Sequence, residues 1–155
     1  MKSRLVLFDI DGTILLTAGA GRRAITTALR EEVGAVDAFA QVRFDGKTDP
    51  QIVGELLTAA GHAAPHEAER VEAVCRRYVA LLEAELAHPT STTTLMPGVH
   101  ALLDALEARR EVVLGLLTGN VEQGAALKLR AAGLAPARFA VGAYGSDAAH
   151  RPDRR

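Results

Sequence analysis

Two carboxylates one residue apart are the first feature of this sequence that could do chemistry. Asp9 and Asp11 follow the apolar run Leu5–Phe8 in the stretch RLVLFDIDGTILL. Side chains alternate along an extended chain, so both carboxylates point to one side and Ile10 points to the other. Their like charges repel unless a cation lies between them or one carboxyl is protonated. Mg2+ prefers such hard oxygen ligands and fills its shell with water and substrate phosphate.

A second polar group follows a second apolar run. Val112–Leu117 is continuously apolar, and Thr118, Gly119 and Asn120 come directly after it. In open α/β sheets, ligands bind outside the carboxyl ends of the strands. We therefore expect this group to lie near the two carboxylates, with Gly12 allowing the backbone to turn tightly away from the first strand.

The spacing of apolar residues predicts an α/β fold. Leu5–Phe8, Val112–Leu117 and the weaker Phe139–Val141 are short apolar runs typical of buried strands. From about Ala20 to Leu86 the spacing is helical, and a strand–helix–strand order resumes after it. This order favours a parallel sheet core that is interrupted by a helical insertion.

Turn and capping signals divide the helical block. A first helix ends at Gly34, which suits a position just past a helix C-terminus. Thr48 or Asp49 caps a second helix, with Pro50 at its first position. Pro65 opens a third helix.

The linker AHPTSTTTLMPG ends the helical block and sets the expected domain boundaries. We predict a discontinuous core domain of residues 1–16 and 96–155 and an inserted helical domain of residues 17–95. Within the core, Asn120 is expected to cap the helix that follows the second strand.

Composition and charge limit the possible partners. The 155 residues are 48% hydrophobic and 24% charged, which is typical of a globular chain. The formal net charge of −1 gives no electrostatic reason to expect a nucleic acid or an anionic membrane as a partner. No apolar run is long enough to predict a membrane span, and the first residues do not resemble a signal peptide.

The single cysteine does not indicate a disulfide, and the histidines do not indicate a histidine metal site. Cys75 has no second cysteine to pair with, which favours a reducing, cytoplasmic location. It lies on the apolar side of a helical pattern, so we expect a buried structural thiol. His62 and His66 are four residues apart, but they lack a third partner for a metal site.

Several motifs together carry a family resemblance. DIDGTI resembles the first signature of the haloacid dehalogenase-like phosphohydrolases, and LGLLTGN resembles the second. GKTD and LMPGV, at the loop and the return of the helical block, resemble the cap-bearing phosphoglycolate phosphatase and phosphoglucomutase branch. The resemblance implies a three-layer Rossmann-like core with a helical cap. It also implies Mg2+-dependent hydrolysis of a small phosphorylated metabolite through an aspartyl-phosphate intermediate.

The resemblance assigns roles at the first motif. Asp9 would be the nucleophile, and Asp11 would be the acid for the leaving oxygen and then the base for the attacking water. The Asp9 carboxylate and the Asp11 backbone carbonyl would hold Mg2+. An aspartate at position 11 also argues against the dehalogenase branch, which does not need this acid and base.

The phosphate site is implied in the same way. Thr118 would bind the transferring phosphoryl group together with Gly12 and the backbone amides of Gly119 and Asn120. The family's third motif is a basic residue that offsets phosphoryl charge. Two residues are candidates for it, with Lys128 preferred over Arg151.

Substrate contacts are expected from the helical insertion. Lys47 and Thr48 lie in the GKTD loop, which would bring them near the phosphate or the distal end of the substrate. Arg22, near the junction with the core, could contact an anionic substrate. The alternative for the GKTD loop is a turn with a helix cap, and the alternative for Arg22 is a solvated arginine that does not contact the substrate.

One family element is not visible in the sequence. Family members carry a further strand beside the first one, and its acidic end completes the Mg2+ site. No such strand follows Val141, and Asp147 and Asp153 lie in a polar tail. We therefore expect a core truncated at the C-terminus, whose unpaired edge at Leu5–Phe8 permits dimers. The alternative function is a catalytically impaired fragment or a non-catalytic phosphate-binding remnant.

A receiver-like signalling domain is a hypothesis from a different function class. Receivers also place acidic residues after a first strand, but they need a phosphoacceptor aspartate at the end of a middle strand. Asp45 and Asp49 follow no such strand, which argues against a receiver.

Overall fold

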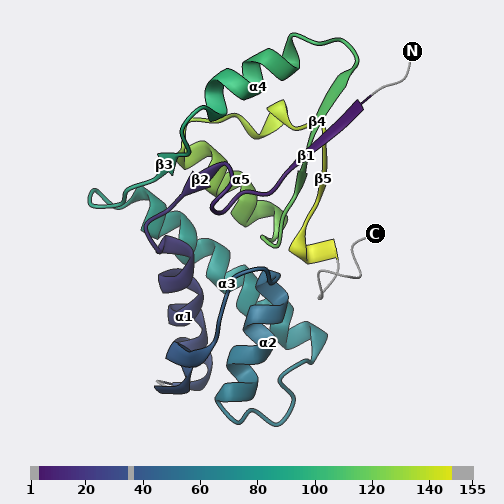
Figure 1. The fold of residues 1–155 in the computed structure, drawn as a ribbon. Coiled ribbons are helices and arrows are strands. Elements are labelled where there is room, and N and C mark those ends of the chain that lie inside the picture. Colours follow the sequence, from purple (N-terminus) through teal and green to yellow (C-terminus); the bar gives the residue numbers. More distant parts are fainter. Residues whose placement is uncertain (1–3, 35–36, 148–155) are drawn as a thin grey trace.

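The structure is a computed structural model that describes residues 4–34 and 37–147. In chain order, its strands and α-helices are β1 (Arg4–Phe8), β2 (Leu15–Leu16), α1 (Ala20–Val33), α2 (Asp49–Ala59), α3 (Ala68–Ala87), β3 (Thr94–Leu95), α4 (Val99–Glu107), β4 (Val112–Leu117), α5 (Glu122–Ala131) and β5 (Val141–Ala143). They form a sheet unit, made of β1, β4, β5, α4 and α5, and a helical unit, made of α1, α2 and α3 (Figure 1).

The sheet is parallel, as the sequence predicts. Its strand order is β1-β4-β5, so β4 is central and β1 is an edge strand within the described residues. Leu7 pairs with Gly115, which in turn pairs with Val141. This order brings the carboxyl ends of β1 and β4 side by side, where the sequence places its two polar groups.

One face of the sheet is covered and the other is exposed. Figure 1 shows α4 and α5 on the same side of the strands, where Val6 and Phe8 of β1 join their core. On the opposite face, Leu5 is 56% exposed and Leu7 is 47% exposed. The described residues therefore form two of the three layers that the resemblance implies.

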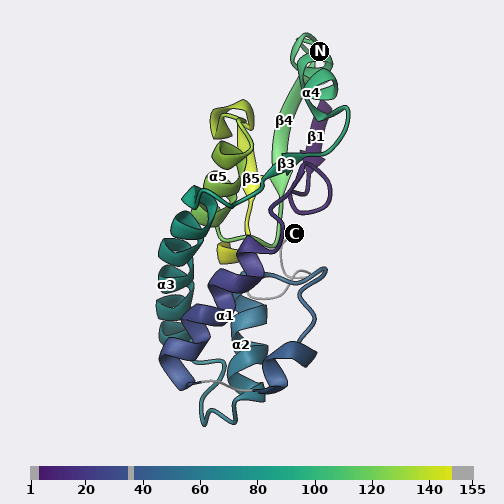
Figure 2. The same cartoon turned by 90° about the vertical axis from the view of Figure 1, so that its left-hand side faces the viewer.

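The helical unit has its own apolar core. α1, α2 and α3 pack against one another, as Figure 2 shows, with Leu29, Leu57 and Tyr78 among the buried residues. Helices dominate the segment between β2 and β3, in agreement with the helical periodicity. Cys75 is buried in this core, as expected.

Two very short strands join the units. Leu15 of β2 pairs with Leu95 of β3 in an antiparallel arrangement, so the entry to the helical unit and the exit from it lie side by side. These strands fall next to the predicted boundaries at 16/17 and 95/96. The division into two domains at these positions remains our proposal.

Element boundaries agree with the sequence in most places. β4 covers the predicted residues, Gly34 follows α1, and Thr48 caps α2 through a hydrogen bond from the Gln51 amide. α3 begins at Ala68 rather than at Pro65, because residues before Ala68 form turns instead of helix.

Two further boundary predictions were wrong. The third strand is Val141–Ala143, not Phe139–Val141, because Phe139 ends a 3-10 turn and packs its ring against Phe8. Val121, not Asn120, is the N-cap residue of α5. The Asn120 side chain is instead bonded to the first strand's loop, as described below.

Candidate active site

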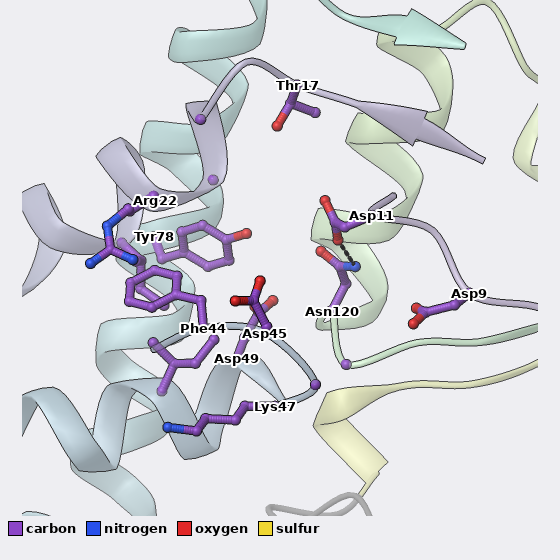
Figure 3. Close-up of a pocket in the computed structure, with 16 residues that line it drawn as sticks. Asp9, Asp11, Thr17, Arg22, Phe44, Asp45, Lys47, Asp49, Tyr78 and Asn120 are labelled. Carbon is purple, nitrogen blue, oxygen red and sulfur yellow. Dashed lines mark hydrogen bonds between the residues drawn. The ribbon is translucent and has the colours of Figure 1, made fainter. Parts of the chain in front are cut away.

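The loop that carries the first two carboxylates is fixed by Ile10. Its side chain is fully buried, and its carbonyl accepts hydrogen bonds from the amides of the three residues at positions 13–15. Gly12 has a φ of 76°, a value that favours glycine, and it reverses the chain. Since Ile10 is anchored in the core, Asp9 and Asp11 are left on the side that faces the helical unit (Figure 3).

The loop after β4 is bonded to the loop after β1. The side-chain Nδ2 of Asn120 donates to Thr118 Oγ1 at 2.7 Å and to Asp11 Oδ2 at 2.7 Å. Thr118 is fully buried, and its own amide donates to Ala143 at the end of β5. The two polar groups that the sequence predicts at neighbouring strand ends therefore form one cluster.

Lys128 joins this cluster from α5. Its ammonium donates to Asp11 Oδ1 at 2.7 Å, and its side chain is only 6% exposed, whereas that of Asp11 is 50% exposed. A Cβ added to Gly21 of α1 would lie 3.4 Å from the Lys128 ammonium. The lysine thus lies where the sheet unit meets the helical unit, with its charge directed at the first motif.

The helical unit is docked closely on the loop after β4. A Cβ added to Gly119 would lie 2.1 Å from the carbonyl oxygen of Lys47, and one added to Gly145 would lie 2.0 Å from the carbonyl oxygen of Gly119. The Asp49 amide donates to Gly119 at 2.8 Å. Three backbone segments therefore cross at a point that has no room for a side chain.

Asp49 forms the second link across this contact. It is the first residue of α2 and is 8% exposed, and its Oδ2 accepts a hydrogen bond from the Val121 amide at 2.9 Å. Burial raises the pKa of Asp49 to about 6, against the opposing effects of the Lys128 charge and the Val121 hydrogen bond, while the charge of Asp11 raises it further. Asp49 is therefore largely ionised at neutral pH, and its ionised form lowers the stability of the fold.

Tyr78 of α3 contributes a neutral hydroxyl. Burial raises its pKa well above the ordinary value, and the negative charges of Asp49 and Asp11 act in the same direction. The phenol therefore keeps its proton and can donate a hydrogen bond.

A cavity of about 350 Å³ lies between the two units (Figure 3). The residues that line it are Asp9, Asp11, Thr17, Gly19, Gly21, Arg22, Ile25, Phe44, Asp45, Gly46, Lys47, Asp49, Ile52, Tyr78, Gly119 and Asn120. The cavity is therefore large enough for a small molecule and has acidic groups on both of its walls.

The structure brings together most of the residues that the sequence singles out. Asp9, Asp11, Arg22, Lys47, Gly119 and Asn120 line the cavity. Thr118 and Lys128 are buried and bonded to Asn120 and Asp11 of that lining. Arg151 lies outside the described residues.

Two predicted residues have other tasks in this structure. Gly12 does not line the cavity, and its amide donates to the Leu15 carbonyl within the turn. Thr48 caps α2 and packs against Gly119 through its backbone. Their proposed contacts with phosphate and substrate stay predictions.

Arg22 and Lys47, the two cations of the helical unit in the described lining of the cavity, contact neighbouring groups. The Arg22 guanidinium lies 4.3 Å from the centre of the Phe44 ring and donates to the Phe39 and Val42 carbonyls at 3.4 and 3.2 Å. The Lys47 ammonium is paired with Glu55. In Figure 3, Lys47 extends away from Asp11 and Asn120.

The donor set fits Mg2+ in part. The Asp9 carboxylate and the Asp11 backbone are hard oxygen donors, and Mg2+ commonly binds to one or two carboxylates and completes its shell with water and phosphate. The part of the chain that the structure describes contains no cluster of three or more His, Cys, Asp or Glu residues suited to a metal. Asp147 does not line the cavity, and its carboxylate accepts a hydrogen bond from the Tyr144 amide.

Asp49 and Tyr78 are the site residues that sequence reasoning missed. The sequence suggests Asp49 as a helix cap and argues against it as a receiver phosphoacceptor, and it places Tyr78 in an apolar stripe. A single signal was available for Asp49: once Thr48 serves as the cap, the neighbouring carboxylate has no local task. The approach of α2 to the loop after β4 depends on tertiary packing, so no local pattern reveals it.

Comparison with known proteins identifies the family. A model of the haloacid dehalogenase-like hydrolases matches residues 3–155. A phosphoglycolate phosphatase of Cereibacter sphaeroides is 34% identical over 104 residues, which cover 66% of this chain and 45% of that protein. The chain thus matches about half the length of this curated relative.

Solved structures share the fold. A hydrolase from Pseudomonas syringae superposes with a TM-score of 0.69 at 19% identity, covering 97% of this chain and 64% of that one. CbbY from Rhodobacter sphaeroides, solved in complex with phosphate, gives a TM-score of 0.59 at 24% identity, covering 94% of this chain and 65% of that one. At these identities the likeness concerns the fold alone.

Proposed function

Because the chain belongs to the haloacid dehalogenase-like hydrolases, we propose that its cavity is the active site of a phosphomonoester hydrolase for a small phosphorylated metabolite. The observation that carries the proposal is the bonded cluster of Asp11, Asn120, Thr118 and Lys128 beside Asp9. The names of the relatives support a phosphate ester as the bond that is broken. Activity, substrate and cofactor of the whole protein all belong to this proposal.

The proposed reaction has two steps. In the first, a carboxylate oxygen of Asp9 attacks phosphorus, the ester P–O bond breaks, and the leaving oxygen takes a proton from Asp11. In the second, water attacks the aspartyl phosphate and gives a proton to Asp11, and the bond between Asp9 and phosphorus breaks. Inorganic phosphate and the free carboxylate of Asp9 are regenerated.

Asp11 must change partners during this reaction. Its two oxygens accept hydrogen bonds from Lys128 and Asn120 in the present arrangement. A bound phosphoryl group offers oxygens that can take over these two donors. Asp11 would then be released to face the leaving oxygen, and it would take from solvent the proton that it gives to that oxygen.

The other groups position the phosphoryl group. Thr118 and the loop amides would donate hydrogen bonds to it, while Lys128 would offset its charge. Mg2+ held by the Asp9 carboxylate and the Asp11 carbonyl would supply further positive charge at the transferring group. The close docking of the helical unit would exclude water from the cavity, and its movement would admit substrate.

Phosphate release and phosphate binding, measured together, test the proposal. The chain is incubated with 4-nitrophenyl phosphate over a range of Mg2+ concentrations, and binding of inorganic phosphate is followed by NMR. Mg2+-dependent phosphate release supports the hydrolase. Phosphate binding without release supports the alternative, a non-catalytic phosphate-binding remnant, and absence of both overturns the phosphate site.

The proposal includes a cytoplasmic location, which rests on the single cysteine. Within residues 4–34 and 37–147, no helix combines the length and apolarity needed to cross a membrane. Dimerisation through the edge of β1 is a further proposal, tested in the Discussion.

A further inference from the structure

The helical wall of the cavity carries two carboxylates besides two cations. Asp45 and Asp49 both line this wall. Asp49 is buried and attached to the Val121 amide, so its carboxylate keeps a fixed position. A ligand group that reaches Asp49 therefore meets a fixed hydrogen-bond acceptor with negative charge.

The cations on the same wall are already engaged. Arg22 is held by two carbonyls and the Phe44 ring, and Lys47 is held by Glu55. Glu55 is itself fixed by a hydrogen bond from Gln51 at 3.0 Å. Recruiting either cation for a second anionic group of the substrate would require breaking these contacts and leaving their partners unpaired.

The remaining polar groups also favour ligand donors over ligand anions. Asn120, which lines the cavity from the sheet side, has a buried Oδ1 that accepts no hydrogen bond from the described residues. Thr17 and Tyr78 contribute hydroxyls, which can form hydrogen bonds with neutral ligand groups as well as with charged ones. Among the described residues of the lining, Asn120 thus offers an acceptor that has no donor, whereas the cations of Arg22 and Lys47 already have partners.

We propose that the substrate's alcohol carries hydrogen-bond donors, amino or hydroxyl groups, and no second anionic group, and that Asp49 selects for it. This inference rests on the proposed function, since the phosphoryl group must bind at Asp9 and Lys128. An ammonium or hydroxyl beyond the ester oxygen would face the carboxylate of Asp49. A carboxylate at that place would face like charge in a partly desolvated cavity, which costs affinity.

Three probes of matched size and inorganic phosphate test the proposal. Aminoethyl phosphate, hydroxyethyl phosphate and phosphoglycolate share a two-carbon skeleton and differ in the terminal group, and inorganic phosphate reports the phosphoryl site alone. Dissociation constants are measured by calorimetry at pH 7.5 with MgCl2 present, in the Asp9→Asn chain so that no ester is consumed. We expect aminoethyl phosphate to bind at least about tenfold more tightly than phosphoglycolate, with hydroxyethyl phosphate between them.

Two neutralising variants locate the selectivity. In the same background, Asp49→Asn keeps the shape and an acceptor for Val121, and should reduce the preference to about threefold or less. Glu83→Gln removes one negative charge from an exposed position on α3 outside the cavity and should leave the preference unchanged. Circular dichroism checks that both variants fold.

The outcomes separate this inference from the proposed function. If inorganic phosphate binds but phosphoglycolate binds as tightly as aminoethyl phosphate or more tightly, the inference fails and the phosphate site stands. If the preference persists unchanged in Asp49→Asn, the assignment to Asp49 fails. If no probe binds, inorganic phosphate included, the proposed function is overturned together with the inference.

Discussion

The two walls of the cavity come from different units and carry different chemistry. The sheet unit presents Asp9, Asp11 and Asn120 at the ends of its strands, with Lys128 bonded behind them. The helical unit presents apolar surface, hydroxyls, carboxylates such as Asp49, and two cations that are held by neighbouring groups. We infer that the sheet wall performs the reaction and that the helical wall recognises the rest of the substrate. Such a division allows the residues that recognise the substrate to be substituted while the residues that react stay the same.

The units that carry these walls also differ in packing. The helical unit has a closed core, joined by Val121 of the sheet unit, in which Leu29, Leu57 and Leu82 are fully buried. The sheet unit buries one face only and leaves Leu5, Leu7 and Val141 exposed on the other. Substitutions should therefore have different consequences in the two units.

The largest expected effect comes from removing the proposed nucleophile on the sheet wall. Asp9→Asn should lower turnover of a phosphomonoester by about 10⁴-fold, because an amide oxygen cannot form the aspartyl phosphate. Asp9 lies at a loop edge outside the apolar core, so the thermal unfolding midpoint should change little. Phosphate release and differential scanning calorimetry measure the two quantities. Turnover retained in this variant would exclude Asp9 as the nucleophile.

The next effect concerns the contact that joins the walls. Gly119→Ala would place a Cβ 2.1 Å from the Lys47 carbonyl oxygen, so α2 and its preceding turn must move away. We expect a loss of about 3 kcal/mol of unfolding free energy, together with weaker phosphate binding. Urea denaturation and phosphate titration by NMR are the measurements.

Gly124→Ala is the matched control for this contact. Gly124 lies in α5, and a Cβ there would meet its nearest neighbour at an ordinary 3.4 Å. Alanine also favours a helix, so this variant should be as stable as the unchanged chain or slightly more stable. Equal effects of the two glycine substitutions would show that the close docking of the helical unit does not determine stability.

A smaller effect is expected from neutralising the helical wall. Burial raises the pKa of Asp49 from 3.8 to about 6, so the folded chain holds this proton at pH values where the unfolded chain has released it. The ionised Asp49 therefore destabilises the fold increasingly as pH rises from about 4 to about 6. Asp49→Asn lacks this penalty and retains an acceptor for the Val121 amide.

The stability difference between Asp49→Asn and the unchanged chain is the measurable quantity. It should be near zero at pH 4, grow as pH rises and level off above pH 6 at no more than about 3 kcal/mol in favour of the variant. Urea denaturation at several pH values provides it. A difference that does not depend on pH would refute the buried, ionisable state of Asp49. A variant that is more stable but less selective would show that Asp49 is retained for function.

The same contrast explains what the sequence could predict. Val112–Leu117 was identified to the residue because a buried parallel strand needs a continuous apolar run. The proximity of Asp11 to Thr118 and Asn120 followed from strand ends that meet at one edge of the sheet. Both inferences depend on patterns that are local in sequence.

The errors arise where tertiary contacts reassign a locally plausible residue. Asn120 is a residue type that favours helix caps, but its side-chain amide donates to Thr118 and to Asp11, and Asp11 is 109 positions away from it in the chain. Phe139 is apolar like a strand residue, yet its ring packs against Phe8, and the pairing of β5 with β4 begins only at Val141. Asp49 belongs to this group, since its partner Val121 is 72 positions away.

The smallest expected effect on stability concerns the exposed face of the sheet unit. Leu5 of β1 is 56% exposed at a strand that has a single neighbour within the described residues. An edge strand of this kind can pair with a second copy, and charged side chains prevent such pairing. Leu5→Lys should therefore abolish concentration-dependent dimers in sedimentation velocity while changing the unfolding free energy by no more than about 0.5 kcal/mol. Leu102→Lys, a similarly exposed leucine on α4, is the control and should leave the dimers intact. Dimers that persist in Leu5→Lys, or an unchanged chain that stays monomeric at all concentrations, would show that this edge does not mediate association.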